Sequence, residues 1–320
     1  MGKSRLGPAR QIIGVLMLVA TLAGAGSIAH AKDFPAAIDL PATTPRVETL
    51  GQLQLHIRAA NELTQIPADI TPTPWHANDR SIIYADGCME NRDVTVRSKC
   101  VFGDKTARRE MWLIGDSHAA QWFYTVQAYA LKHHYKLVVH AKSNCELTHP
   151  IAKKIAWSAC TGLNRYWRHH IKVNRPDLVL VGLYQGWTKR VVPQVQSALK
   201  LLAKSAKHVV LIGDTSRRNP DTRQCLKANP AAVQHCSMEL TDGIDFVTAS
   251  RLKRGASANH YLYLDTHDWL CQQGKCPAIA ANLILYRDYT HITGVAATWL
   301  IPIFDVQLNA LLKSKFKGGL

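Results

Sequence analysis

The stretch MWLIGDSH, residues 111–118, decides the fold class of this chain. Its first four residues, 111–114, are all apolar, which is typical of a strand buried on both faces of a parallel sheet. Gly115 and Asp116 then predict a turn, and an amphipathic pattern that continues to about Lys132 predicts a helix. A buried strand that leads through a tight turn into a helix is the repeating unit of α/β proteins.

Working outward from this stretch, the same alternation continues along the chain. Further apolar runs predict strands over 136–140, 177–183, 208–212 and 261–265, and helical patterns lie over 164–173 and 193–205. Right-handed crossovers between such units give a three-layer α/β/α sandwich with a mostly parallel, flavodoxin-like sheet. Pro302 interrupts the last helical pattern, 295–315, and predicts a break or kink there.

The N-terminus carries the features of a secretory signal. Three basic residues precede an apolar run over 12–23, and small residues ending in Ala29-His30-Ala31 follow it. The run is shorter than the roughly 20 residues that span a bilayer. We therefore predict a cleaved signal peptide over residues 1–31, with an uncleaved N-terminal anchor as the alternative.

The remaining chain divides into two parts. Residues 32–86 are rich in proline and polar residues, with one short helical pattern at 53–60, and predict an extended lead-in that wraps the domain or links it to another part. Residues 87–320 then form the α/β domain. This length suits one well-buried core and is too short for two large domains.

All eight cysteines lie beyond the predicted cleavage site, and an even number in an exported protein favours disulfides. In sequence they fall into four close pairs, so we predict bridges within each pair rather than a zinc site: Cys88–Cys100, Cys145–Cys160, Cys225–Cys236 and Cys271–Cys276. Only the last pair has a tight spacing, and no second pair matches it as zinc ligands would require.

The chain is strongly basic, with a formal net charge of +16, and +13 remains after residues 1–31 are removed. Such a charge attracts anionic polymers, acidic glycans or lipid headgroups, although solubility alone also accounts for it. No nucleic-acid recognition motif is present, and export argues against that class of partner.

Two groups of residues carry the chemistry of acyl transfer. Ser117 follows the first strand at the carboxyl end of the sheet, where reactive groups of parallel sheets gather. On its own it is equally a helix N-cap. Near the C-terminus, Asp288 and His291 form a D-x-x-H pair in which the carboxylate can orient the imidazole. The imidazole can then remove the serine proton, so the three residues predict a catalytic triad.

Residues 112–122, WLIGDSHAAQW, resemble the nucleophile block of the SGNH hydrolase superfamily. More narrowly, they resemble the SGNH domain fused to acyltransferase-3 proteins, which O-acetylate bacterial surface glycans. Segments around Cys88 and Cys100, around 176–187 and over 264–291 extend the likeness. The resemblance implies an SGNH fold, no metal or other cofactor, and an acyl group carried on Ser117.

The sequence departs from the superfamily in its oxyanion-stabilising residues. Gly182 or Gly186 would supply the glycine donor, and we favour Gly182. No G-x-N-D block is present, and the third strand instead ends in Gly213-Asp214-Thr215, so the asparagine donor is missing from its expected place. His118 is predicted to pack in the site or to contact substrate, and Trp187 to stack on a sugar ring.

The leading hypothesis is therefore an exported enzyme of the periplasm or cell surface that acts on cell-envelope carbohydrate. Water accepts the acyl group in an esterase, and a sugar hydroxyl accepts it in a transferase. A transferase needs an acyl donor, either a separate membrane-bound acyltransferase-3 protein or a soluble ester. The competing hypothesis is a glycan-binding module that keeps the SGNH fold without catalysis.

Overall fold

The computed structural model describes residues 37–76, 79–90, 100–145, 147–148 and 157–317. The predicted signal peptide, residues 1–31, lies outside the described residues. Within the described part of the chain, no helix is both long and apolar enough to cross a membrane.

The centre of the structure is a seven-stranded sheet in the order β1-β4-β3-β5-β6-β8, with β2 also paired to β4. Every pairing in it is parallel except the one between β2 and β4. The strands are β1 (Met89–Glu90), β2 (Val101–Gly103), β3 (Arg109–Gly115), β4 (Tyr135–Lys142), β5 (Leu178–Gly182), β6 (His208–Ile212) and β8 (Leu262–Leu264).

Side chains of the central strands alternate between two separate cores. In β3, Met111 and Leu113 belong to one buried cluster, whereas Trp112 and Ile114 belong to the other. The same alternation runs through β5 and β6, because successive side chains of a strand point to opposite faces of the sheet. Both faces are therefore covered, and the predicted three-layer sandwich with a mostly parallel sheet is confirmed.

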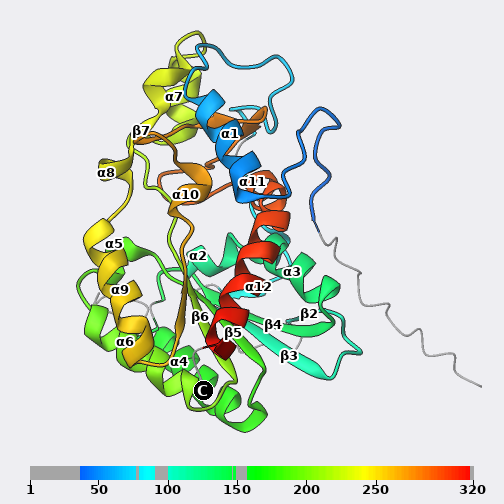
Figure 1. Ribbon diagram of the computed structural model, residues 1–320, viewed down its shortest axis with the longest axis vertical. Coiled ribbons are helices and arrows are strands. Elements are labelled where there is room, and N and C mark those ends of the chain that lie inside the picture. The colour runs from blue at the N-terminus through cyan, green and yellow to red at the C-terminus, as the bar shows by residue number, and fades with distance from the viewer. Residues whose placement is uncertain (1–36, 77–78, 91–99, 146, 149–156, 318–320) are drawn as a thin grey trace, which may run out of the picture. The chain divides into compact units, whose positions relative to one another are not determined.

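Helices form the two outer layers. The first core contains side chains of α1, α3, α11 and α12, and the second contains side chains of α4, α6 and α9 (Figure 1). The helices are α1 (Leu50–Ala60), α2 (Ser117–Ala120), α3 (Phe123–Lys132), α4 (Trp157–Asn174), α5 (Gln185–Thr188), α6 (Val192–Ala203), α7 (Thr222–Ala228), α8 (Leu240–Gly243), α9 (Phe246–Ala258), α10 (His267–Leu270), α11 (Gly294–Trp299) and α12 (Ile301–Lys317).

One helical prediction differs from the structure, and another is met just before the expected residue. The single helix expected after Ser117 is divided into α2 and α3, with Gln121 and Trp122 between them. The break predicted at Pro302 is present, since α11 ends at Trp299 and α12 begins at Ile301. Pro302 lies in the first turn of α12, where a missing backbone N–H costs nothing.

The lead-in packs on the same core as the sheet. Helix α1 begins with a capping box in which Thr49 and Gln52 satisfy each other's backbone N–H groups. Leu53 and Ile57 on this helix are fully buried, and α1 contacts α10 and the short strand β10 (Ile279–Ala280). These residues therefore pack against the first core of the sheet. The domain boundary after residue 86 stays a prediction.

The structure also contains four disulfides and several short elements. The disulfides join Cys88 to Cys100, Cys145 to Cys160, Cys225 to Cys236 and Cys271 to Cys276, and no cysteine is free. The short elements are η1 (Ile82–Tyr84), η2 (Val233–Cys236), β7 (Met238–Glu239), β9 (Lys275–Cys276) and β11 (Leu283–Ile284). Strand β7 pairs with β9, which brings two of the disulfides into one cluster.

Candidate active site

Two glycines shape the turn that presents Ser117. Gly115 ends β3 with φ of +141°, and a Cβ atom there would lie 1.9 Å from the carbonyl oxygen of Gly182. Gly182 is the register partner of Gly115 on β5, and a Cβ atom on it would lie 2.5 Å from the Cα of Ala119. Glycine at both positions therefore lets α2 lie directly against the carboxyl ends of β3 and β5.

Asp116 ties this turn to the loop after β5. One of its carboxylate oxygens accepts the N–H of His118 at 2.7 Å, and the other accepts the N–H of Tyr184 at 2.9 Å. Burial raises the pKa of Asp116 to about 6, against these hydrogen bonds and the nearby charge of His118. The N–H of Ser117 has no acceptor among the described residues, so it is free to bind a developing oxyanion.

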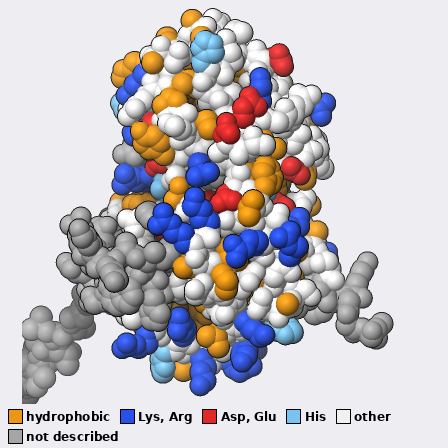
Figure 2. Space-filling view, turned by 90° about the vertical axis from the view of Figure 1, so that its left-hand side faces the viewer, with side chains coloured by type: hydrophobic (Ala, Val, Ile, Leu, Met, Phe, Trp, Pro, Cys, Tyr) orange, Lys and Arg blue, Asp and Glu red, His pale blue; other side chains and the backbone are white. Residues whose placement is uncertain are grey.

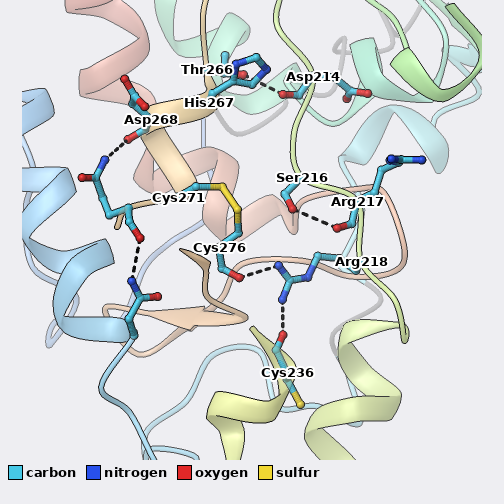
Figure 3. Close-up of a disulfide and its surroundings, with 12 residues drawn as sticks. Asp214, Ser216, Arg217, Arg218, Cys236, Thr266, His267, Asp268, Cys271 and Cys276 are labelled. Carbon is cyan, nitrogen blue, oxygen red and sulfur yellow. Dashed lines mark hydrogen bonds between the residues drawn. A yellow bond between two sulfur atoms is a disulfide. The ribbon is translucent and has the colours of Figure 1, made fainter. Parts of the chain in front are cut away.

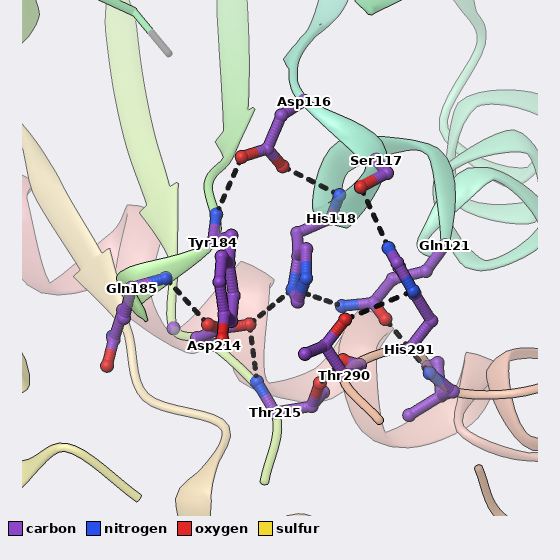
Figure 4. A network of polar contacts seen from close by, with 12 residues as sticks. Asp116, Ser117, His118, Gln121, Tyr184, Gln185, Asp214, Thr215, Thr290 and His291 are labelled. Carbon is purple, nitrogen blue, oxygen red and sulfur yellow. Dashed lines mark hydrogen bonds and ion pairs between the residues drawn. The ribbon is translucent and has the colours of Figure 1, made fainter. Parts of the chain in front are cut away.

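The structure brings the three predicted catalytic residues together, and Figure 4 shows the side chains of Ser117 and His291 facing each other. Nε2 of His291 lies 2.8 Å from Oγ of Ser117, and Nδ1 of His291 lies 2.9 Å from both carboxylate oxygens of Asp288. In the tautomer that satisfies this network, Nδ1–H donates to Asp288 and Nε2 accepts the serine hydroxyl. That is the geometry of a nucleophile, a general base and a group that orients the base.

The D-x-x-H segment is held in a closed turn. Oδ1 of Asp288 also accepts the backbone N–H groups of Thr290 and His291, each at 2.9 Å. Next to this turn, Oε1 of Gln121 accepts the N–H of Ile292 at 3.0 Å. Because Gln121 is the C-cap residue of α2, this bond fixes the histidine-bearing loop relative to the serine-bearing helix.

The protonation states favour a neutral base beside an ionised carboxylate. Burial lowers the pKa of His291 to about 4, and the charges of His118 and Arg287 act in the same direction against the hydrogen bond to Asp288. For Asp288, burial opposes ionisation, but the hydrogen bond and charge of His291, with Arg287, outweigh it and lower the pKa. At neutral pH, His291 is thus able to accept a proton.

A second histidine–carboxylate pair lies directly beside the first. Nδ1 of His118 lies 2.5 Å from Oδ1 of Asp214, and both side chains are almost completely buried. The other oxygen of Asp214 accepts the N–H of Gln185 at 2.8 Å. Burial disfavours the charged form of His118, yet Asp214, with Asp116 and Asp288, overcomes this effect and raises the pKa of the imidazole.

The three residues predicted to stabilise the oxyanion or contact substrate have different surroundings. Gly182 permits the close packing of α2, and its role as a donor stays a prediction. His118 is buried and ion-paired with Asp214. Trp187 belongs to α5, and its side chain lies outside the described part of the structure.

Residues that the sequence did not single out complete the site. The superfamily usually has an asparagine donor just after the third strand, and this chain has Asp214 after β6. The carboxylate of Asp214 faces His118. The Gly213-Asp214-Thr215 run was the available signal, but it reads equally as a simple turn. The roles of Gln121 and Tyr184 depend on contacts across the fold that no local spacing indicates.

A cavity of about 550 Å³ opens beside the histidine loop and is lined by residues that include Tyr184, Arg217, Tyr289 and Thr290. A larger cavity of about 890 Å³ lies between the lead-in and α12, and no triad residue lines either cavity. The smaller cavity is the better candidate for binding substrate, because Thr290 lies next to His291 in the chain.

Comparison with known proteins defines the class of protein. The family model of the SGNH domain found fused to AT3 domains matches residues 87–306, more than half of the chain. This protein therefore belongs to that SGNH family, as the sequence resemblance predicted. No curated protein matches the chain in sequence.

Solved structures agree with the fold. The periplasmic domain of a lipopolysaccharide acetyltransferase from Salmonella ser. Paratyphi A aligns with a TM-score of 0.54 and 16% identity, over 71% of this chain and 87% of that chain. An acetylxylan esterase from Geobacillus stearothermophilus gives a TM-score of 0.38 at 13% identity, over 64% of this chain and 96% of that chain. A carbohydrate acetylesterase family member from Sinorhizobium meliloti gives 0.38 at 12%, over 63% and 99%. At these identities the first match supports the shared fold and the other two carry no further argument.

Proposed function

We propose that this protein is an exported serine-dependent acyltransferase or esterase that moves an acyl group, usually acetyl in this family, to or from cell-envelope carbohydrate. The observation that carries the proposal is the chain of contacts from Ser117 through His291 to Asp288 at the carboxyl end of β3. Membership of the SGNH family supports acyl transfer as the reaction class.

In the first step, Oγ of Ser117 attacks the carbonyl carbon of an acyl ester while Nε2 of His291 takes the hydroxyl proton. Asp288 stabilises the imidazolium that forms. The negative charge on the carbonyl oxygen is met by the N–H of Ser117, with Gly182 as the proposed second donor. The intermediate then collapses, the ester oxygen leaves with the proton from His291, and the acyl group remains on Ser117.

In the second step, water or a sugar hydroxyl attacks the acyl-enzyme, and His291 removes its proton. The bond between the acyl group and Oγ then breaks, and His291 returns the proton to Oγ, which restores the Ser117 hydroxyl. Water makes the protein an esterase, and a sugar makes it a transferase. A transferase would receive its acyl group from a separate membrane-bound acyltransferase-3 protein or from a soluble ester.

Export is part of the proposal. All eight cysteines are paired in disulfides, which persist in oxidising compartments such as the periplasm. The signal-like N-terminus over residues 1–31 supports the same location. Exported carbohydrate polymers are then within reach of the site.

The deciding experiment is labelling of the purified, oxidised protein with a fluorophosphonate probe, with the labelled residue located by mass spectrometry. We expect labelling at Ser117 that is lost in Ser117→Ala and in His291→Ala. The second variant removes the base while the nucleophile remains. Absence of labelling in well-folded wild-type protein would reject the proposed chemistry.

One observation favours the alternative of a non-catalytic glycan-binding module. Asp214 holds a carboxylate near the position where the superfamily usually has an amide donor, and removal of one such donor can cost about a hundredfold or more in rate. A binding module predicts that glycan binding survives Ser117→Ala and that no acyl-enzyme forms. Measurable turnover that requires Ser117 would exclude this alternative.

A further inference from the structure

Two consecutive arginines follow β6, and their side chains point apart (Figure 3). Arg218 is buried, and its guanidinium donates to the carbonyl oxygen of Cys276 at 2.8 Å and to that of Cys236. Arg218 therefore joins two disulfide-bonded segments through these two hydrogen bonds. Arg217 turns away from this cluster and lines the cavity of about 550 Å³ beside the histidine loop.

The backbone holds Arg217 firmly in this position. Its N–H donates to the carbonyl oxygen of Gly243 on α8 at 2.9 Å, and the N–H of Arg218 donates to the carbonyl oxygen of Tyr289 at 2.7 Å. A Cβ atom on Gly243 would lie 2.2 Å from Oγ of Ser216, so α8 packs closely on this loop. The arginine is thus presented between α8 and the loop that carries His291.

The charge of Arg217 is not balanced within the described part of the chain. Its half-buried guanidinium bonds the hydroxyl of Tyr184, and no described carboxylate forms an ion pair with it. Asp242 lines the same cavity but is exposed, so water screens its charge. A guanidinium in this setting offers a fork of N–H donors that matches a carboxylate or phosphate group.

Arg217 is also close to the reacting residues. The ring of Tyr184, which its guanidinium contacts, stacks on His118 with centroids 4.9 Å apart, and His118 lies 4.6 Å from His291. Thr290 lines the cavity and places Oγ1 3.2 Å from Nδ1 of His291. Arg217 and the residue that precedes His291 therefore line the same cavity.

We propose that Arg217 binds an anionic group of the saccharide substrate, so that the preferred substrate is an acidic glycan. This inference rests on the proposed function, because it assigns a substrate class to the same site. In Figure 1, α5 and α8 border the left-hand side of the structure, and Figure 2 shows Lys and Arg side chains gathered on that face. Such a face draws polyanions toward the cavity before they bind.

The test measures binding by calorimetry in full-length protein carrying Ser117→Ala, so that it does not depend on catalysis. The probes are trigalacturonate for a carboxylate, glucose 6-phosphate for a phosphate, and maltotriose as the neutral control. We expect one of the two anionic probes to bind, and adding Arg217→Met to weaken it by at least about tenfold, the size of a charge-assisted hydrogen-bond pair. Which anionic probe responds identifies the anionic group.

Two further variants sharpen the result. Arg217→Lys keeps the charge but loses the fork, so binding should fall to an intermediate level. Asp242→Asn removes the opposing charge of the cavity and should tighten binding. Equal affinity for maltotriose and the anionic probes, or anionic binding unchanged by Arg217→Met, would overturn the acidic-glycan assignment. Fluorophosphonate labelling of wild-type Ser117 tests the proposed function separately, so the two failures are distinguishable.

Discussion

The imidazole ring of His118 lies 4.6 Å from that of His291, centroid to centroid, with its Nδ1 bonded to Asp214. Against the effect of burial, Asp214 raises the pKa of His118 above its usual value, so His118 is charged in the acidic range where His291 titrates, and this charge opposes a second positive charge on His291. The base that accepts the Ser117 proton thus has His118 on one side and is oriented by Asp288 on the other. Above about pH 4 in that range, the charged imidazole is that of His118 and the neutral one is that of His291.

The first prediction concerns the dependence of the serine reaction on pH. His291 must be neutral to act, and burial with the charges of His118 and Arg287 lowers its pKa to about 4 while Asp288 opposes them. The fall in fluorophosphonate labelling that reports His291 should therefore reach half only near pH 4, and a separate change near pH 6 would report Asp116. An unperturbed histidine would give half the rate near pH 6.5.

The double variant His118→Gln with Asp214→Asn tests the origin of this shift. It removes both charges together, so no unpaired charge is left buried. Without the cation beside it, His291 should have a higher pKa, and the half-rate point should move upward from about 4 toward 6.5. Circular dichroism at each pH separates this change from acid unfolding. A half-rate point that stays near pH 4 would show that burial and the charge of Arg287 set the pKa without His118.

The second prediction concerns the contact between α2 and β5. Gly182→Ala places a Cβ atom against the backbone of Ala119, and relief of that clash should cost about 1–3 kcal/mol in the free energy of unfolding. Gly51→Ala is the matched control, because its Cβ atom in α1 would meet nothing within 4 Å. That variant should be more stable than the wild type by up to about 1 kcal/mol.

Urea unfolding of the oxidised proteins gives both values, and labelling of Ser117 reports the effect on the site. We expect Gly182→Ala also to label more slowly, because α2 carries the nucleophile. A Gly182→Ala protein with wild-type stability and wild-type labelling would mean that the helix shifts at no cost, and that a glycine is not required there.

The sequence predicted the sheet and the triad because both are marked locally. Residues 111–114 of β3 are a continuous apolar run, and Asp288 and His291 are three residues apart, so one closed turn brings them together. Ser117 then follows from the carboxyl-end rule for parallel strands. Ser117 and His291 are 174 residues apart in the chain. Their contact could be inferred only through the fold.

The features that sequence reasoning missed depend on pairs of residues far apart in the chain. His118 and Asp214 are separated by 96 residues, and each stands in a run that reads as an ordinary turn. The division between α2 and α3 likewise has no proline or glycine to mark it. It occurs where Gln121 turns its side chain to the N–H of Ile292. Tertiary contacts, not helix propensity, set that break.

The third prediction compares two disulfides whose four cysteines are all buried. Cys145–Cys160 closes a loop with a sequence separation of 15, and Cys271–Cys276 closes one of 5. Loop-closure entropy predicts losses of about 3 and about 2 kcal/mol when each pair is replaced by alanine. Because the four cysteines are similarly buried, the difference of about 1 kcal/mol should remain in urea unfolding. Equal losses in the free energy of unfolding would contradict loop length as the cause of the stabilisation.

The last prediction concerns the orienting carboxylate. In Asp288→Asn the side-chain amide can accept a hydrogen bond only at its oxygen, so it cannot accept from His291 and from the turn's backbone N–H groups as the carboxylate does. The imidazole would lose the tautomer that leaves Nε2 free for Ser117, and the imidazolium would lose its counter-charge. We expect fluorophosphonate labelling to slow by about 10³–10⁴-fold. Asp268→Asn, an exposed change on α10, is the matched control and should label at the wild-type rate. Labelling of Asp288→Asn within tenfold of the wild type would show that the closed turn orients His291 without the carboxylate, and that Asp288 is not a working member of the triad.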